Sequence, residues 1–508
     1  MKKVKEKKEV KNKPFYKKGW FAAAITATVV LILVLVAVLD YNLVSLGIKV
    51  VCRPWKVSEP DNYIEILEKT EFLAEDLEYN SAYKNGYMDI IAPKDVQGKQ
   101  PVLVYAHGGY YVGGSKESAE PYCRMIAAEG FVVANINYNL APQAKYPIQA
   151  KQTNEAIKFL CENAEKYHID EDQIFIAGDS AGGHLASQMG AFYTNEALQA
   201  KMNFEPSITA EQLKGVLLLC GFYDGETVRD SKFPFLNTAM WSWTDVRKYE
   251  KYSRWDEIST INWVTENYPS TYITCGSDDP FYVQAEKMVM KLSNNEVETT
   301  AYLPKSTNKK LKHEFQKDFS LKEATTAMNM VLSFMKSNST FDQEAQKTYA
   351  TFTFSGGQNV KVELMKKYAP ISVENFIKYA NAQFYDNTVI HRVISNKVVQ
   401  GGGIDTEDVM KGALYPPIVG EFADNGYGYN KLSHLAGVIS MARTTEYDSA
   451  TSQFFFCVSD CSNYDGEYAA FGKIVEGLDF IDAISSSPVY GDKPQNTFVI
   501  TSVTISQE

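Results

Sequence analysis

Short apolar runs that end in glycine-rich turns mark the middle of the chain. Val102–Ala106 is apolar and leads directly into a glycine-rich segment, and Gln173–Ala177 does the same. Gly183–Met189 follows the second turn with residues typical of a helix. Apolar runs of this length bounded by turns are typical of buried strands. The pattern therefore predicts a strand, a tight turn and a helix between residues 173 and 189.

The pattern changes near residue 336. Leu321–Met335 has the spacing of an amphipathic helix, and Lys336–Gln346 is a polar break. Beyond it, Thr351–Phe354 and Asn359–Leu364 alternate between apolar and polar positions as strands do. Later segments are short and separated by turns, which favours a closed β structure. We expect one domain over residues 55–336, a linker over 337–348 and a second domain over 349–508.

The N-terminal segment has the pattern of a membrane anchor. The first 18 residues hold nine lysines against two glutamates, and Phe21–Leu39 is a run of 19 uncharged, mostly apolar residues, long enough to span a bilayer. A cleaved signal peptide is the alternative, but no small-residue cleavage site directly follows Leu39. We expect a basic cytoplasmic tail over residues 1–20, a lipid-embedded anchor over 21–43 and, by the positive-inside rule, both domains on the extracytoplasmic side.

Charge and cysteine content narrow the partners and cofactors. The formal net charge is −11, and about −18 remains once the basic tail is set aside. This charge repels phosphate backbones, so nucleic acid is excluded as a partner. The seven cysteines are odd in number and form no Cys-x-x-Cys pair. We expect no disulfide scaffold, no metal site and no cofactor.

The turn after residue 177 carries candidate chemistry, because Gly178-Asp179-Ser180-Ala181-Gly182 places a serine between glycines. A serine at a strand-to-helix turn of this kind has an exposed hydroxyl and is typical of a nucleophile. The glycine-rich segment after Val102–Ala106 would let backbone N–H groups approach a substrate oxygen. We expect an oxyanion hole formed by the N–H groups of Gly108, Gly109 and Ala181.

A nucleophilic serine needs a base and an acid. The chain has six histidines, and His313 is the candidate base that remains once those in other contexts are set aside. The acid should end a strand between Ser180 and His313. The strand predicted over residues 270–276 leads to Asp279, which we favour, while Asp278 and Asp224 are its rivals.

Residues 60–336 resemble the hormone-sensitive-lipase-like esterases of the α/β-hydrolase superfamily, through five motifs in order: His107-Gly108-Gly109, Tyr138-Asn139-Leu140-Ala141-Pro142, Gly178-Asp179-Ser180-Ala181-Gly182-Gly183, Asp279-Pro280 and His313-Glu314-Phe315. The resemblance implies a mostly parallel sheet with helices on both faces, and hydrolysis of small to medium acyl esters of small molecules, lipids or glycans. Tyr110 departs from the usual third glycine of the oxyanion motif. The aromatic stretch from Phe222 to Trp263 would either roof an acyl pocket or form the core of a cap.

Residues 350–506 resemble the cyclophilin prolyl isomerases through colinear segments: Phe384–Ile394, Gln400–Gly403, Gly437–Arg443, Ser452–Phe456 and Tyr468–Lys473. The resemblance implies a closed β-barrel that acts on X-Pro bonds of polypeptides. It assigns catalysis to Arg392, peptide binding to Gln400, and an apolar proline pocket to Met441, Ala442 and Phe455.

Several positions depart from the cyclophilin pattern. Lys397 and Val398 replace an aromatic residue and a Met or Leu on the pocket wall, and Asn463-Tyr464 replaces a Trp-Leu pair. Tyr468 stands where a histidine is common. We expect a pocket that is more polar and shallower on one side, with weakened isomerase activity and poor cyclosporin binding. The alternative is that only one domain is catalytic, the cyclophilin-like domain serving as a peptide-binding module or the hydrolase as a scaffold.

Overall fold

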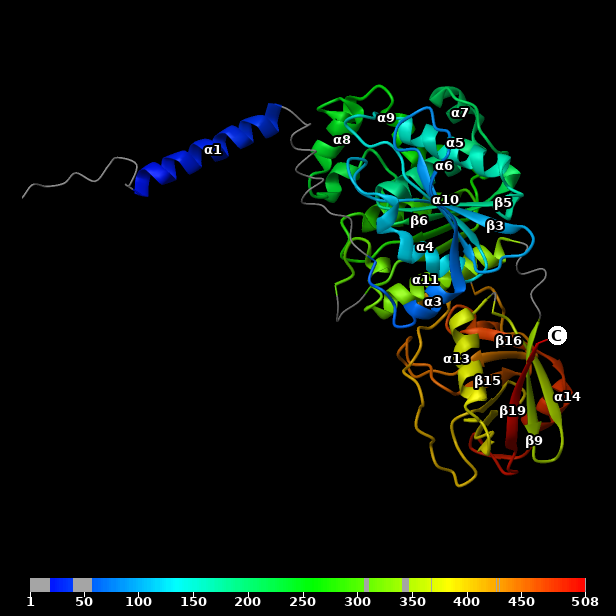
Figure 1. The fold of residues 1–508 in the computed structure, drawn as a ribbon. Coiled ribbons are helices and arrows are strands. Elements are labelled where there is room, and N and C mark those ends of the chain that lie inside the picture. Colours follow the sequence, from blue (N-terminus) through cyan, green and yellow to red (C-terminus); the bar gives the residue numbers. More distant parts are fainter. Residues whose placement is uncertain are drawn as a thin grey trace, which may run out of the picture.

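The structure is a computed structural model that describes residues 19–39, 57–305, 310–339, 347–366, 368–425, 427–428 and 430–507. Two compact bodies follow one another along the chain (Figure 1). Most of the tail expected over residues 1–20 and most of the linker expected over 337–348 lie outside the described residues.

The first body is built on an eight-stranded sheet in the order β1-β2-β4-β3-β5-β6-β7-β8. The two pairings of β2 are antiparallel, and every later pairing from β4 to β8 is parallel. Strands buried on both faces read as apolar runs, which is why β3 and β5 are visible in the sequence. The strands are β1 (Thr70–Glu78), β2 (Tyr87–Pro93), β3 (Gln100–Ala106), β4 (Val132–Ile136), β5 (Ile169–Asp179), β6 (Leu213–Leu219), β7 (Thr271–Thr274) and β8 (Thr299–Tyr302).

Helices flank this sheet on both sides, as expected (Figure 1). Helix α6 follows β5 directly and packs against β5 and β6, so the residue between β5 and α6 lies at the carboxyl edge of the sheet. The helices are α3 (Tyr63–Lys69), α4 (Glu120–Ala127), α5 (Ile148–Glu162), α6 (Ala181–Thr194), α7 (Glu196–Met202), α10 (Tyr282–Asn294) and α11 (Lys322–Ser337), with 3-10 turns at η2 (Lys116–Ser118), η3 (Ala210–Gln212) and η7 (Phe315–Lys317).

A cap of short helices connects β6 to β7. It consists of η4 (Val228–Ser231), α8 (Leu236–Thr244), η5 (Tyr249–Lys251), α9 (Trp255–Ile258) and η6 (Thr260–Trp263). Trp243 is fully buried and stacks on Tyr111 with ring centroids 4.0 Å apart. Of the two alternatives left open for the aromatic stretch, Trp243 thus belongs to the core of the cap.

The second body is a nine-stranded antiparallel sheet in the order β11-β19-β9-β10-β16-β14-β15-β13-β12. The outermost strands in this order, β11 and β12, are separated in the chain by only Ile390 and His391, so the sheet curls round on itself. The strands are β9 (Thr348–Phe354), β10 (Asn359–Leu364), β11 (Thr388–Val389), β12 (Arg392–Ile394), β13 (Val398–Gly401), β14 (Val438–Met441), β15 (Phe454–Cys457), β16 (Ala470–Glu476) and β19 (Val499–Gln507).

Side chains that alternate along β9 and β10 fill the interior of this barrel. Phe352, Phe354, Val360 and Val362 are buried, while the residues between them are more exposed, which confirms the predicted alternation. Helices α13 (Pro370–Asn381) and α14 (Leu478–Ser485) complete the domain, together with η8 (Ala423–Asn425), η9 (Ser462–Tyr464) and the hairpin of β17 (Val489–Tyr490) and β18 (Lys493–Pro494). Helix α11 of the first body contacts α13 of the second.

The N-terminal helix α1 covers Gly19–Leu39, and its side chains are described from residue 22 to residue 32. Within the described part of the chain, no helix is both long enough and apolar enough to cross a membrane. The anchor expected over residues 21–43 is therefore not supported by the structure, and residues 40–43 lie outside the described part.

Candidate active sites

Ser180 occupies a strained turn between β5 and α6. Its backbone angles are φ 53° and ψ −112°, a conformation that non-glycine residues rarely adopt and that clusters at functional sites. The flanking glycines leave no room for a side chain, because a Cβ at Gly182 would lie 2.0 Å from the carbonyl oxygen of Ala106 and one at Gly178 would lie 2.4 Å from the Gly182 backbone. Close packing of the turn on β3 therefore requires both glycines.

The structure brings Ser180, His313 and Asp279 together in one line of hydrogen bonds. The Ser180 Oγ lies 2.9 Å from His313 Nε2, and His313 Nδ1 lies 2.7 Å from Asp279 Oδ2. Burial lowers the pKa of His313, but the Asp279 carboxylate outweighs it and the pKa lies above its ordinary value. This arrangement can take a proton from the serine hydroxyl and stabilise the imidazolium that results.

The rival acids have other partners. Asp278 accepts a hydrogen bond from the Leu311 N–H at 3.0 Å. Asp224 pairs with Lys287 at 2.7 Å. Of the three candidates, Asp279 is thus the one in contact with His313.

The three expected oxyanion donors differ in what they bind. Ala181 is the first residue of α6, so its N–H has no carbonyl partner one turn back within the helix. Gly109 has φ +123°, and a Cβ there would lie 2.3 Å from the Gly113 carbonyl oxygen. The Gly108 N–H instead donates to Asp179 Oδ2 at 3.1 Å. Tyr110, where the family motif has a glycine, has φ 61°, in the left-handed region that glycine adopts freely.

A buried charged cluster next to Ser180 was not anticipated from the sequence. Lys317 Nζ lies 2.7 Å from Asp179 Oδ2 and 3.6 Å from Glu314 Oε2. Asp179 also accepts a hydrogen bond from the Tyr105 hydroxyl at 2.8 Å. Asp179 and Glu314 flank the serine and the histidine in the chain, which is a usable signal, whereas nothing in the sequence singles out Lys317.

Aromatic rings enclose the histidine. Phe233 of the cap and Phe281, just before α10, contact the His313 ring edge-on, with centroids 4.7 Å and 5.7 Å away. Tyr110 packs on Phe233 at 5.2 Å. The wall beside the triad is therefore aromatic and apolar, as an acyl group requires.

Two cysteines lie against the triad acid. The thiols of Cys220 and Cys275 and a carboxylate oxygen of Asp279 lie within 4.8 Å of one another, all buried. Burial raises the pKa of both thiols, which disfavours the thiolate form that metals bind. Asp279 is already engaged by His313 and by the Phe281 N–H at 2.8 Å.

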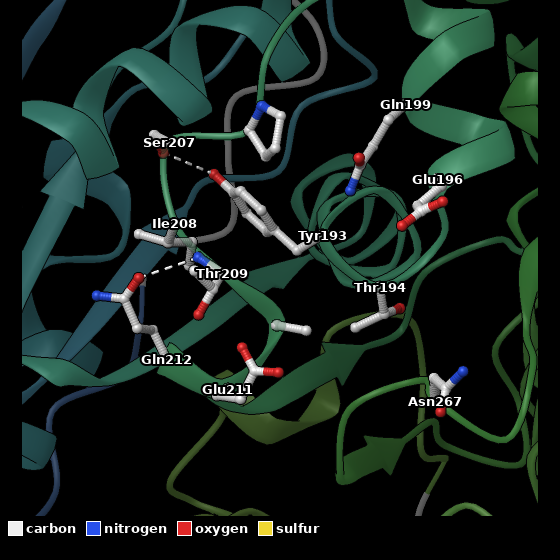
Figure 2. A pocket seen from close by; sticks show the side chains of 12 residues that line it. Tyr193, Thr194, Glu196, Gln199, Ser207, Ile208, Thr209, Glu211, Gln212 and Asn267 are labelled. Carbon is white, nitrogen blue, oxygen red and sulfur yellow. Dashed lines mark hydrogen bonds between the residues drawn. The ribbon is translucent and has the colours of Figure 1, made fainter.

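A separate pocket of roughly 690 Å³ lies at the opposite end of α6 (Figure 2). Tyr193 and Thr194, the last residues of α6, line it, whereas Ser180 precedes the first residue of that helix. At 1.5 Å per residue this places the pocket about 20 Å from the serine. Its polar groups are largely engaged, since the Tyr193 hydroxyl contacts Ser207 at 3.1 Å and Gln212 accepts from the Thr209 N–H at 2.9 Å.

In the second body, Arg392 and Gln400 pair across β12 and β13. Arg392 Nη1 donates to Gln400 Oε1 at 3.3 Å, and Arg392 Nε donates to Asp492 Oδ2 at 3.1 Å. Gln400 in turn donates to Gln453 at 3.0 Å. The guanidinium is partly exposed and held by its neighbours, so it is oriented while remaining accessible.

The expected pocket residues divide between two sides of the sheet. Phe455 lies in a small apolar cluster with Val398, against which Ala442 packs. Met441 belongs instead to the barrel core with Phe454. Met441 is the last residue of β14 and is 1% exposed, whereas Ala442, the next residue, packs on the other cluster, as successive residues of extended chain do. Met441 therefore supports the pocket from behind and does not line it.

Residues at the positions that differ from the cyclophilin pattern surround Phe455. Tyr464 and Tyr468 meet its ring edge-on with centroids 5.9 Å and 5.6 Å away. Lys397 places its ammonium 5.0 Å from the Tyr464 ring centre. His434, which the sequence did not single out, stacks near the Phe455 ring. Its Nδ1 is hydrogen-bonded to Asp465 Oδ1 at 2.8 Å and its Nε2 to Ser440 Oγ at 3.0 Å.

Comparison with known proteins identifies both bodies. Residues 88–292 match the family described as BD-FAE, and residues 349–505 match the family described as cyclophilin type peptidyl-prolyl cis-trans isomerase/CLD. The chain thus carries an esterase/lipase-like α/β-hydrolase domain and, through its C-terminal region, belongs to the cyclophilin-type peptidyl-prolyl cis-trans isomerases.

Particular relatives illustrate the match. Peptidyl-prolyl cis-trans isomerase A of Dickeya dadantii is 44% identical over 168 residues, covering 31% of this chain and 84% of the relative. Peptidyl-prolyl cis-trans isomerase B of Escherichia coli is 36% identical over 162 residues, covering 29% and 94%. The crystal structure of esterase B from Lactobacillus rhamnosis superimposes with a TM-score of 0.49 at 21% identity, covering 54% of this chain and 88% of that one.

Proposed function

We propose that the chain is a bifunctional enzyme, a serine ester hydrolase joined to a peptidyl-prolyl isomerase. The observation that supports the hydrolase most directly is the line of hydrogen bonds from Ser180 through His313 to Asp279. Ser180 attacks the ester carbonyl while His313 takes its proton and later gives it to the departing alcohol. Asp279 orients His313 and stabilises its charged form, and water then releases the acid from the acyl-serine by the same route.

The oxyanion of the tetrahedral intermediate is bound by the N–H groups of Gly109 and Ala181. Gly108 contributes by fixing the loop, since its own N–H is bound by Asp179. The aromatic wall of Phe233 and Phe281 offers an apolar surface to an acyl group. The resemblance to hormone-sensitive-lipase-like esterases implies small or medium acyl groups, carried by small molecules, lipids or glycans.

The test of the hydrolase is a panel of aryl esters from acetate to decanoate, offered to the full chain and to Ser180→Ala. We expect hydrolysis of the shorter esters and a loss of at least about 10⁴-fold in kcat for the variant. Ser207→Ala, at a serine about 20 Å from the site by the helix-length estimate, is the matched control and should retain activity. Equal hydrolysis by Ser180→Ala would refute the proposal.

The isomerase proposal rests on Arg392, Gln400 and Phe455. An X-Pro bond isomerises slowly because amide resonance must be broken, and a donor to the proline nitrogen lowers that barrier. Arg392 supplies the donor, Gln400 binds the peptide backbone, and Phe455 with Ala442 holds the proline ring. The tyrosines and Lys397 around Phe455 narrow and polarise the pocket, so we expect weakened activity and poor cyclosporin binding.

A prolyl isomerase assay on an X-Pro peptide tests the proposed activity by comparing Arg392→Ala with a control variant, Lys473→Ala. Lys473 is an exposed cation on β16. We expect only the arginine variant to lose activity. Peptide binding without any rate enhancement in the native chain would favour a binding module, the alternative in which only one domain is catalytic.

Membrane attachment is a proposal that rests on the sequence. The lysine-rich tail and the uncharged run Phe21–Leu39 support a single anchor with a cytoplasmic N-terminus and extracytoplasmic domains. Fractionation of cells with an alkaline carbonate wash tests it. Recovery of the chain in the washed membrane pellet is the expected result, and release into the wash would contradict it.

A further inference from the structure

Three ionisable side chains are buried together beside the proposed nucleophile. Asp179 precedes Ser180, Glu314 follows His313, and Lys317 lies in η7 one turn further on. The side chains of Asp179, Glu314 and Lys317 are 1%, 7% and 2% exposed. Buried charges are costly unless they are paired. Two carboxyl groups with a single ammonium group are balanced only if one carboxyl keeps its proton.

The contacts show which carboxyl keeps the proton. Asp179 is 2.7 Å from the Lys317 ammonium and accepts from both the Tyr105 hydroxyl and the Gly108 N–H. Glu314 is farther from Lys317, at 3.6 Å, and shares a side-chain hydrogen bond with Asp179, in which the carboxyl that keeps its proton must be the donor. Asp179 thus has the partners of a carboxylate, and Glu314 those of a carboxylic acid.

The pKa shifts of Asp179 and Glu314 agree with a charged Asp179 and a neutral Glu314. Burial would raise the pKa of Asp179, but Lys317 and the hydrogen bond from Glu314 hold it below its ordinary value. Burial raises the pKa of Glu314 to about 7, against the opposing charge of Lys317. The charged or titratable groups that face Glu314 include Lys317, Asp179, His313 and Cys220.

Glu314 also touches the catalytic machinery. Its Oε1 lies 3.9 Å from His313 Nε2, the atom that exchanges a proton with Ser180. A Cβ built on Gly108 would lie 3.0 Å from Glu314 Oε1 and 2.4 Å from Asp179 Oδ2, so the oxyanion loop rests directly on the two carboxyl groups. Glu314 has φ +60°, a left-handed conformation that a glutamate rarely adopts.

We propose that Glu314 is a positioning residue of the esterase: as a neutral acid it donates to Asp179, which holds the Gly108 loop, and its ionisation places a second negative charge beside His313 and the oxyanion. The inference rests on the proposed ester hydrolysis. An extra buried anion opposes the negative charge that develops on the substrate oxygen. The ester-hydrolysis rate should therefore fall as Glu314 loses its proton.

The test compares Glu314→Gln with the native chain on an aryl butyrate between pH 6 and pH 9. Glutamine keeps a donor for Asp179 and cannot ionise. We expect the variant to match the native kcat near pH 6, and the ratio of variant to native kcat to rise at least about threefold by pH 9. Glu165→Gln, at an exposed position of the same domain, should give a ratio near one throughout.

A second measurement separates titration from catalysis. A buried acid whose folded pKa exceeds its unfolded value binds more protons when folded, so stability falls as pH rises between the two values. The thermal unfolding midpoint of Glu314→Gln, relative to that of the native chain, should therefore rise as the pH is raised from 5 to 8. A kcat ratio independent of pH overturns the proposal even if this gain is seen. No ester hydrolysis by the native chain would instead refute the proposed function itself.

Discussion

At the residue scale, two adjacent aspartates follow β7 and only one reaches the histidine. Asp279 Oδ2 is 2.7 Å from His313 Nδ1, while Asp278 caps the Leu311 N–H. The sequence favoured Asp279 but left its neighbour open, because two successive residues at a strand end are equally placed until the turn is known. In the folded turn the Phe281 N–H donates to Asp279 Oδ1 at 2.8 Å, which leaves Oδ2 for the ring.

The two aspartates can be separated by matched variants. Asp279→Asn should lower the kcat of ester hydrolysis by about 10⁴-fold, because the amide no longer holds the imidazole in the right tautomer. Asp278→Asn should keep kcat within a fewfold of native. Steady-state kinetics on one aryl ester decides between them, and the reverse ranking would mean that Asp278 is the acid.

The histidine also sets the acid side of the pH profile. The pKa of His313 lies above its ordinary value of 6.5, because Asp279 outweighs burial. A base works only when neutral, so kcat/KM should rise with pH through a midpoint above about 6.5. A profile already flat from pH 5 upward would contradict the assignment of His313 as the base.

At the scale of elements, the turn from β5 to α6 is the most constrained part of the hydrolase. Gly182→Ala places a Cβ 2.0 Å from a backbone oxygen of β3, which cannot move without disturbing the sheet. We expect at least about 2 kcal/mol of lost stability and a large loss of ester hydrolysis. Gly412→Ala is the matched control, since a Cβ there meets nothing within 4 Å. Equal urea midpoints for the two variants would contradict this account.

The sequence predicted elements with strong patterns better than it predicted contacts across the fold. The strands β3, β5, β9 and β10 and the helices α6 and α11 agree with their apolar runs and alternation. The burial of Lys317 was not predicted. Met441 was expected to line the proline pocket and lies instead in the barrel core. Both outcomes depend on which distant elements pack together, and a local pattern carries no such information.

The membrane anchor is a second case in which a local sequence pattern and the structure differ. An uncharged run indicates what a segment can do in a bilayer, but the described structure supplies no spanning helix to support it.

At the scale of the whole molecule, each body has its own main hydrophobic core, and Tyr427 of the second body is buried in the core of the first. Lys322 of α11 lies 3.4 Å from Asp448, an exposed ion pair of a kind worth at most about 1 kcal/mol. Ser180 and Arg392 lie in different bodies, and substitutions at distant sites with no shared partner act independently. Ser180→Ala should therefore leave prolyl isomerase kcat/KM within about twofold of native, and Arg392→Ala should leave ester hydrolysis equally unchanged. A large cross effect in either assay would show coupling between the domains.

The central claim is that Ser180 is an activated nucleophile, and covalent labelling tests it most directly. The full chain and the variant His313→Ala would each be treated with an aryl fluorophosphonate and digested. The masses of the resulting peptides would then be measured by mass spectrometry. We predict one phosphonyl group on the peptide that contains Ser180, with fluoride released, and a much slower reaction in the variant. No adduct, or an adduct on another serine at an equal rate in both proteins, would contradict the account.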